Sequence, residues 1–180
     1  MQPITLHPVQ SVTIMILADN FFDGLLLDQG VAKRASLGTQ KLDVTTALME
    51  GGQTFESPLA QHGFSALVTL TVGGQTHRVL FDTGATPNGL IANMHTFDIS
   101  PKDIETIVLS HGHFDHTTGL DGVARTLGRT NLPVMIHPDF WSTCLARSQE
   151  DWPMQEGVAN RAERLADEIQ SRFRLLFASL

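Results

Sequence analysis

The stretch Ser110-His111-Gly112-His113-Phe114-Asp115-His116 places three imidazoles and one carboxylate within six residues. Nitrogen and oxygen donors of this kind suit borderline metals such as zinc. The spacing therefore predicts a metal site with four ligands: His111, His113, Asp115 and His116. A polar surface loop rich in histidine is the alternative, but the strand expected just before the motif favours the metal site.

Residues 104–109, with the sequence Ile-Glu-Thr-Ile-Val-Leu, are the kind of short apolar and β-branched run that forms a buried strand. Gly112 permits a tight bend after this strand, and residues 117–123 are expected to begin a helix. A strand end that runs into a helix start is where open α/β sheets usually build their sites. In this arrangement His111 and His113 share one ion, while Asp115 and His116 face a second.

Together with Phe81-Asp82-Thr83-Gly84, this motif resembles the H-x-H-x-D-H signature of the metallo-β-lactamase superfamily. Residues 61–67, 80–84 and 109–120 resemble its branch of dihydropterin-ribofuranosylaminobenzene-phosphate-synthase-like hydrolases. The resemblance covers residues 12–141 and is expected to end at Trp141. It implies an α/β fold of the αββα sandwich type, of which this chain would hold the N-terminal half and a C-terminal amphipathic helix.

The resemblance also implies metal-assisted hydrolysis of a small-molecule substrate through an ester, lactone or phosphodiester bond. One or two zinc ions would lower the pKa of bound water to about 7, with Asp115 as ligand and catalytic, water-orienting carboxylate. Members with two irons typically carry glutamate where this chain has His113, which favours zinc. The alternative function is a truncated metal-binding or structural remnant without turnover.

Three further residues have open roles. Asp82 is expected to accept a hydrogen bond from a ligand imidazole and so to fix its tautomer, unless Asp-Thr-Gly only forms a turn. His62 lies either at the rim of the site or in a structural position. His137 follows a predicted strand and is a third metal ligand, a rim residue or structural.

Composition limits the remaining classes. The chain has 180 residues, of which 42% are hydrophobic, enough for one packed core. A net charge of -7 argues against nucleic-acid binding, which needs a basic face. No apolar run reaches the roughly 18 residues of a membrane span, and the amino terminus lacks a basic leader, so we expect a cytoplasmic protein. Cys144, the single cysteine, is expected to be a small buried hydrophobe.

The rest of the chain is assigned by pattern. A hairpin is predicted around Gly73-Gly74-Gln75, and it delivers Asp82 to the sheet end. Residues 21–60 are expected to be an irregular excursion with room for one short helix, as a flap over the site or a loop without function. The other expected elements are strands at 13–17 and 132–136, a turn at 86–89, helices at 90–97 and 120–127, and a helix start at Ser100-Pro101.

The predicted division is a half-domain over residues 1–150 and a helical tail over residues 151–180. Apolar residues recur at spacings of three and four over residues 158–177, which predicts an amphipathic helix that packs on the sheet or forms a homo-oligomer.

A catalytic zinc usually has three protein ligands, so four motif ligands divided between two ions leave each ion with too few ligands. The alternatives are one weaker site, a ligand from His137, or ligands from another subunit.

Overall fold

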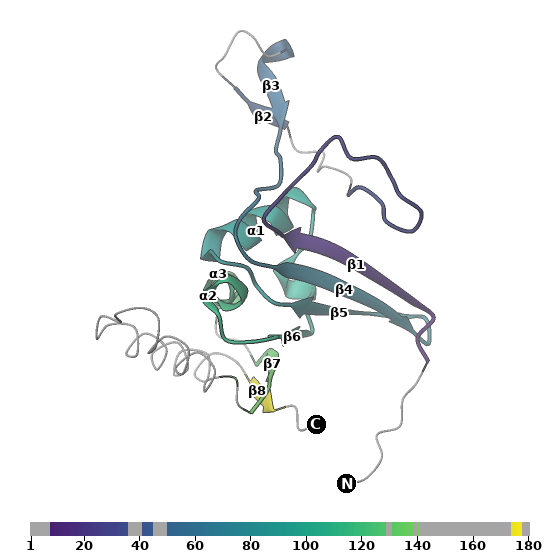
Figure 1. Ribbon diagram of the computed structural model, residues 1–180, viewed down its shortest axis with the longest axis vertical. Helices are drawn as coiled ribbons and strands as arrows, with labels where there is room; N and C mark the ends of the chain where they lie inside the picture. The colour runs from purple at the N-terminus through teal and green to yellow at the C-terminus, as the bar shows by residue number, and fades with distance from the viewer. Residues whose placement is uncertain are drawn as a thin grey trace, which may run out of the picture.

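The computed structural model describes residues 8–35, 41–44, 50–128, 131–138, 140 and 174–177. The described strands form one mixed sheet in the order β1-β4-β5-β6-β7-β8 and a separate pair, β2-β3 (Figure 1). β4 pairs antiparallel with β1 and β5, whereas β5 to β8 run parallel. The strands of the large sheet are β1 (Ser11–Ala18), β4 (Ser65–Val72), β5 (Gln75–Phe81), β6 (Thr106–Val108), β7 (Pro133–Ile136) and β8 (Arg174–Phe177).

The predicted hairpin is confirmed as β4 and β5. Gly73 and Gly74 form its turn with φ of 57° and 80°, a left-handed conformation that glycine adopts without steric cost. Gln75 already pairs with Val72, so the turn is one residue shorter than predicted. The strands expected at 13–17, 104–109 and 132–136 are confirmed as β1, β6 and β7.

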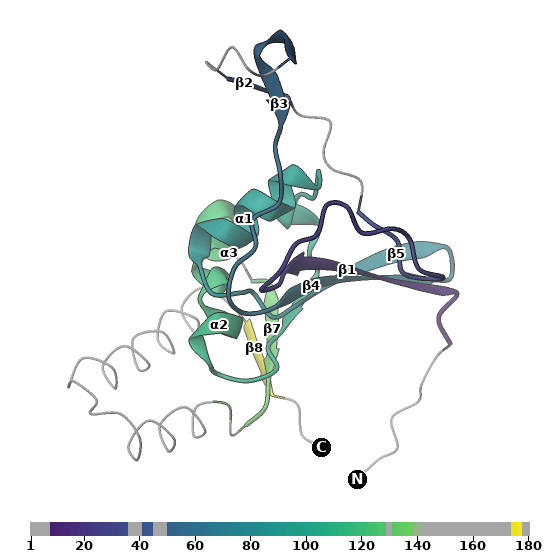
Figure 2. The ribbon, with the colours of Figure 1, turned by 45° about the horizontal axis from the view of Figure 1, so that its top comes forward.

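Helices α1 (Pro87–Thr96) and α3 (Gly119–Leu127) lie side by side over one face of the large sheet (Figure 2). α3 ends at Gly128 as predicted. α1 begins at Pro87 rather than at residue 90, because Thr86 caps it by accepting a hydrogen bond from the backbone N–H of Gly89. The predicted start at Ser100-Pro101 is the single turn η2 (Pro101–Asp103).

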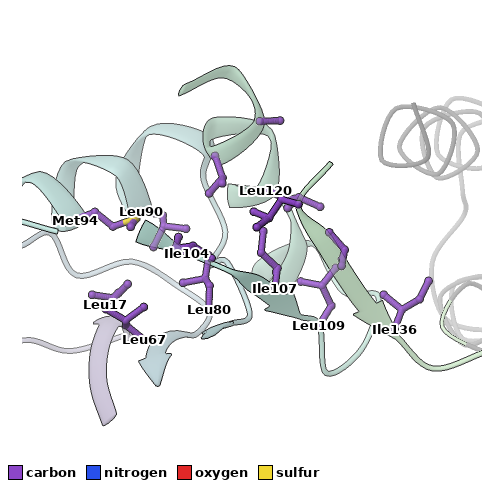
Figure 3. Close-up of a cluster of buried hydrophobic side chains, with 14 of the residues drawn as sticks. Leu17, Leu67, Leu80, Leu90, Met94, Ile104, Ile107, Leu109, Leu120 and Ile136 are labelled. Atoms are coloured by element: carbon purple, nitrogen blue, oxygen red, sulfur yellow. The ribbon is translucent and has the colours of Figure 1, made fainter. Parts of the chain in front are cut away.

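The core lies between these helices and the sheet. Register places Met15, Leu67, Leu80, Ile107 and Val134 opposite one another on five neighbouring strands. Figure 3 shows this cluster between the sheet and the helices; its labelled residues are Leu17, Leu67, Leu80, Leu90, Met94, Ile104, Ile107, Leu109, Leu120 and Ile136. Because one face of each strand is buried, a one-residue slip would expose this row, and the core therefore sets the register of the sheet.

Residues 21–60 differ from the prediction. They contain the antiparallel strands β2 (Lys41–Asp43) and β3 (Gln53–Phe55), and the only helical turn among the described residues of this segment is η1 (Glu50–Gly52). In Figures 1 and 2 the β2–β3 arm extends away from the large sheet and from α2 (Phe114–Thr117). The expectation of a wholly irregular segment is therefore wrong, because β2 and β3 pair within it, whereas one short helical turn is present as expected. These two strands do not form a flap over the motif.

The predicted helix over residues 158–177 is wrong at its end. Arg174–Phe177 form β8, which pairs in parallel with β7 and so joins the sheet of the predicted half-domain. The physical reason is that β7 offers unpaired backbone groups, and pairing with a further strand satisfies them. Residues 151–173 and Cys144 lie outside the described part of the chain. None of the helices within that part is long and apolar enough to cross a membrane.

Candidate metal centre

The motif lies at the edge of the sheet where the parallel strands end. β5 ends at Phe81 and β6 at Val108, so Asp82 and Ser110 come next to each other at the carboxyl edge. The backbone N–H of Asp82 donates to the carbonyl oxygen of Val108 at 2.9 Å. This placement is the usual one for a site in an α/β sheet.

Asp82 is 1% exposed, and its carboxylate has three donors. The backbone N–H of Ser110 donates to Oδ1 at 2.7 Å, and the Ser110 hydroxyl donates to Oδ2 at 2.6 Å. The third donor is His116, whose Nδ1 lies 2.8 Å from Oδ2. The expected hydrogen bond from an imidazole is thus present, while the role of His116 as a metal ligand stays a prediction.

The backbone of Asp82 is unusual, since its φ of 54° is left-handed in a residue other than glycine. Such a conformation is uncommon outside glycine, asparagine and aspartate, and it persists where surrounding contacts hold it. The contacts with Val108, Ser110 and His116 hold it here. Asparagine and aspartate both tolerate this backbone conformation, but only aspartate brings a carboxylate that accepts hydrogen bonds on both oxygens.

Three imidazoles of the motif gather beside Asp82. The ring centroids of His111 and His116 are 4.2 Å apart, and those of His111 and His113 are 4.7 Å apart. Partial burial, and then the charges of His116 and His113, lower the pKa of His111 from its ordinary value of 6.5. Asp82 and Asp115 oppose this shift more weakly. His111 is therefore neutral near pH 7, which is the form that binds a metal.

Asp115 and His116 have a separation that suits one ion. Oδ2 of Asp115 lies 3.4 Å from Nε2 of His116. Two ligands that bind one tetrahedral zinc at about 2.0–2.2 Å lie roughly 3.3–3.5 Å from each other. The chemistry of the donors and the spacing of this pair therefore fit zinc.

A complete ligand set is not assembled. Within the described ranges, no group of three or more His, Cys, Asp or Glu side chains is placed to hold a metal ion. The structure thus brings the four predicted ligands next to one another without converging three of them. His137 follows β7 at the same sheet edge, and its carbonyl oxygen accepts from the backbone N–H of Phe140. Its role as a third ligand stays a prediction.

His62 lies beside the motif. Its Nε2 is 3.3 Å from Oδ2 of Asp115, and its Nδ1 is 3.0 Å from Oδ1 of Asn20. Its ring centroid is 6.2 Å from that of Phe114, and the side chain is mostly exposed. Of the two alternatives for His62, this geometry favours the rim of the site.

Two glycines let other segments approach the motif, and the sequence patterns did not single them out. Gly63 has φ of 103°, and a Cβ there would lie 1.9 Å from the carbonyl oxygen of Asp115. A Cβ at Gly119 would lie 1.8 Å from the carbonyl oxygen of Thr83. Thr83 in turn donates from its N–H and hydroxyl to the carbonyl oxygen of His116. The available signal was that Gly63 directly follows His62 and that Gly119 comes three residues after His116.

Ser110 and α2 were also missed. The sequence pattern assigned Ser110 no role beyond the first position of the motif, yet its hydroxyl contacts both Asp82 and His111. α2 begins directly after His113, so the last part of the motif is helical rather than a loop. The signal for α2 was the run Phe114–Thr117, which contains neither proline nor glycine, before the predicted helix.

Comparisons with known proteins give the following matches. A family model described as "Metallo-beta-lactamase superfamily" matches residues 62–171. The 7,8-dihydropterin-6-methyl-4-(beta-D-ribofuranosyl)-aminobenzene-5'-phosphate synthase of Methanocaldococcus jannaschii is 36% identical over 104 residues, 57% of this chain and 35% of the relative. The uncharacterized protein MJ0448 of the same organism is 40% identical over 80 residues, 44% of this chain and 29% of the relative.

A solved structure of a quorum-quenching N-acyl homoserine lactone lactonase is similar with a TM-score of 0.43 and 16% identity, over 96% of this chain and 59% of that one. The chain spans about a third of the length of the two curated relatives. The family match runs to residue 171, so the expectation that the resemblance ends at Trp141 is wrong. The resemblance to the branch of the synthase is confirmed by the first relative. Because the family model covers more than half of the chain, this protein belongs to the metallo-β-lactamase superfamily.

Proposed function

We propose that this chain binds zinc through His111, His113, Asp115 and His116 and hydrolyses an ester, lactone or phosphodiester bond of a small molecule. The observation that carries the proposal is the 3.4 Å separation of Asp115 Oδ2 and His116 Nε2 at the carboxyl edge of the sheet. Superfamily membership supports the reaction class, and the donor types support zinc.

In this proposal, some residues hold a metal-binding imidazole in place and others orient the water or contact the substrate. Zinc, when bound, lowers the pKa of water to about 7 and polarises the scissile group. Asp82 holds the imidazole of His116 through Nδ1, which leaves the lone pair of Nε2 available to bind a metal. Asp115 orients the attacking water by accepting its hydrogen bond. His62 lies 3.3 Å from Asp115 at the rim of the site, and in this proposal it contacts the substrate.

The name of the first relative suggests a substrate class for the search. That protein is named a synthase of a ribofuranosylaminobenzene 5'-phosphate compound. A substrate panel for this chain should therefore include ribose phosphates and their esters beside lactones, carboxylic esters and phosphodiesters.

Zinc content per chain, measured by elemental analysis, is the first test. We expect one or two ions in the purified protein and a loss of them in His111→Ala/His113→Ala. A matched control is His77→Ala/His95→Ala, which removes two histidines that pair with Glu105 and Glu56 outside the motif. The control should keep the zinc of the natural chain. Near-zero zinc in all three proteins would contradict the proposal.

A metal-binding or structural domain without turnover is the second candidate. It is favoured by the absence of a three-ligand group among the described residues. Zinc-dependent cleavage that disappears in His113→Ala would favour the hydrolase. Bound zinc without cleavage of any member of the panel would favour this second candidate.

A further inference from the structure

The hydroxyl of Ser110 lies between a buried carboxylate and an imidazole of the motif. Ser110 Oγ is 2.6 Å from Asp82 Oδ2 and 2.9 Å from His111 Nδ1. The backbone N–H of the same serine donates to Asp82 Oδ1 at 2.7 Å. One residue thus contacts both carboxylate oxygens and the neighbouring histidine.

The positions of the protons follow from counting donors. A carboxylate only accepts hydrogen bonds, whereas a hydroxyl has a single proton to donate. At 2.6 Å from Asp82, the Ser110 hydroxyl donates to the carboxylate. Its oxygen is then left to accept from His111, so His111 holds its proton on Nδ1. His116 also faces the carboxylate with Nδ1 and must donate from it.

We propose that Ser110 is a positioning residue that extends the hold of Asp82 from His116 to His111. A single buried carboxylate then sets the tautomer of two imidazoles, one directly and one through a hydroxyl. Both rings keep their Nε2 lone pairs for a metal, with ring centroids 4.2 Å apart. The use of these lone pairs rests on the function proposed above, whereas the tautomers follow from the hydrogen bonds alone.

Substitution of Ser110 by alanine and by threonine distinguishes this positioning role from simple packing. Ser110 is exposed, so Ser110→Ala removes the hydroxyl without opening a cavity in the core. Ser110→Thr keeps a hydroxyl on the same carbon and adds a methyl group at an exposed position. A structural role of the backbone N–H would be unchanged in both variants, because each keeps that N–H group.

The test is nuclear magnetic resonance of the full chain labelled with ¹⁵N in its histidines and freed of metal by a chelator. Long-range ¹H–¹⁵N spectra report which ring nitrogen carries the proton, and His111→Gln assigns the His111 signals. We expect Nδ1–H for His111 and His116 in the natural chain. In Ser110→Ala, His111 should lose this preference while His116 keeps it, and Ser110→Thr should restore it.

Zinc titration of the same three proteins gives the second readout. Loss of a group that orients a metal-binding histidine typically weakens metal affinity by about 10–100-fold, so we expect a loss of that size in Ser110→Ala and recovery in Ser110→Thr. An unchanged His111 tautomer in Ser110→Ala, or Nε2–H in the natural chain, would overturn the inference. The expected tautomers without any zinc binding would support the role of Ser110 and overturn the proposed function instead.

Discussion

Two neighbouring rows of side chains cross the large sheet and have different surroundings. One row contains Leu80 and Ile107, which are paired on β5 and β6, point to the helices and are fully buried. The next row contains Ile14 and Val68, paired on β1 and β4, and points to the opposite face. Leu80 is 0% exposed, whereas Ile14 is 62% exposed.

Both rows are apolar, although only one is covered by helices. A sheet with one solvated face normally alternates apolar and polar residues, but β1 places Val12, Ile14 and Ile16 on its exposed face. Residues 21–31 add further exposed apolar side chains, and this segment and β1 line a hollow of about 710 Å³. The pattern of β1 is therefore typical of a strand that is covered on both faces.

The largest expected effect is in the buried row. Leu80→Ala should lower the free energy of unfolding by about 2–5 kcal/mol, because the surrounding core cannot fill the cavity completely. Urea denaturation followed by circular dichroism measures this loss. Leu25→Ala makes the same chemical change at an 88% exposed position and should stay within about 0.5 kcal/mol. An equal loss of unfolding free energy in the two variants would contradict the difference in burial between these two regions.

A smaller loss is expected where α3 meets the turn beside the motif. Gly119→Ala should lower the free energy of unfolding by about 1–3 kcal/mol, because the new Cβ would overlap the carbonyl oxygen of Thr83. Gly24→Ala is the matched control, since its Cβ would come no closer than 3.5 Å to a side-chain atom of Phe22. If Gly119→Ala is as stable as the control, the contact between α3 and residues 82–84 is looser than the structure has it.

The exposed row should respond least to substitution. Ile14→Thr keeps a β-branched side chain and should change the free energy of unfolding by less than about 0.5 kcal/mol. The same urea experiment, repeated at two protein concentrations, measures the change. A loss above about 1.5 kcal/mol would mean that this face of β1 is covered in solution.

Acidification should distinguish the motif from the exposed row. The folded chain holds the pKa of His111 below 6.5, so the unfolded chain binds the proton first as the pH falls. The stability that depends on neutral His111 is therefore fully present above pH 6.5 and is lost below it. Between pH 7.5 and 5.5, the natural chain and Ile14→Thr should lose more stability than His111→Gln. An equal loss in all three proteins would contradict this assignment.

Local signals were sufficient for most of the fold around the motif. The glycine pair predicted the β4–β5 hairpin, and the apolar run before Ser110 predicted β6. These elements depend on residues a few positions apart, which the sequence displays directly. The prediction of a helix up to residue 177 was wrong because the structure there depends on a distant partner. A helical pattern over residues 158–177 cannot show that residues 174–177 pair with β7.

By itself the sequence determined the superfamily, the motif and the strand that carries it, because these reside in short runs with defined residue types and spacing. Only the tertiary structure decided which distant groups meet. Asp82 contacts His116, which lies 34 positions later in the sequence. The hydroxyl of Ser110 contacts both Asp82 and His111. At Gly63, the absence of a Cβ lets the backbone pack closely against Asp115. Such contacts depend on the parallel pairing of β5 with β6, which the buried core stabilises and no local propensity encodes.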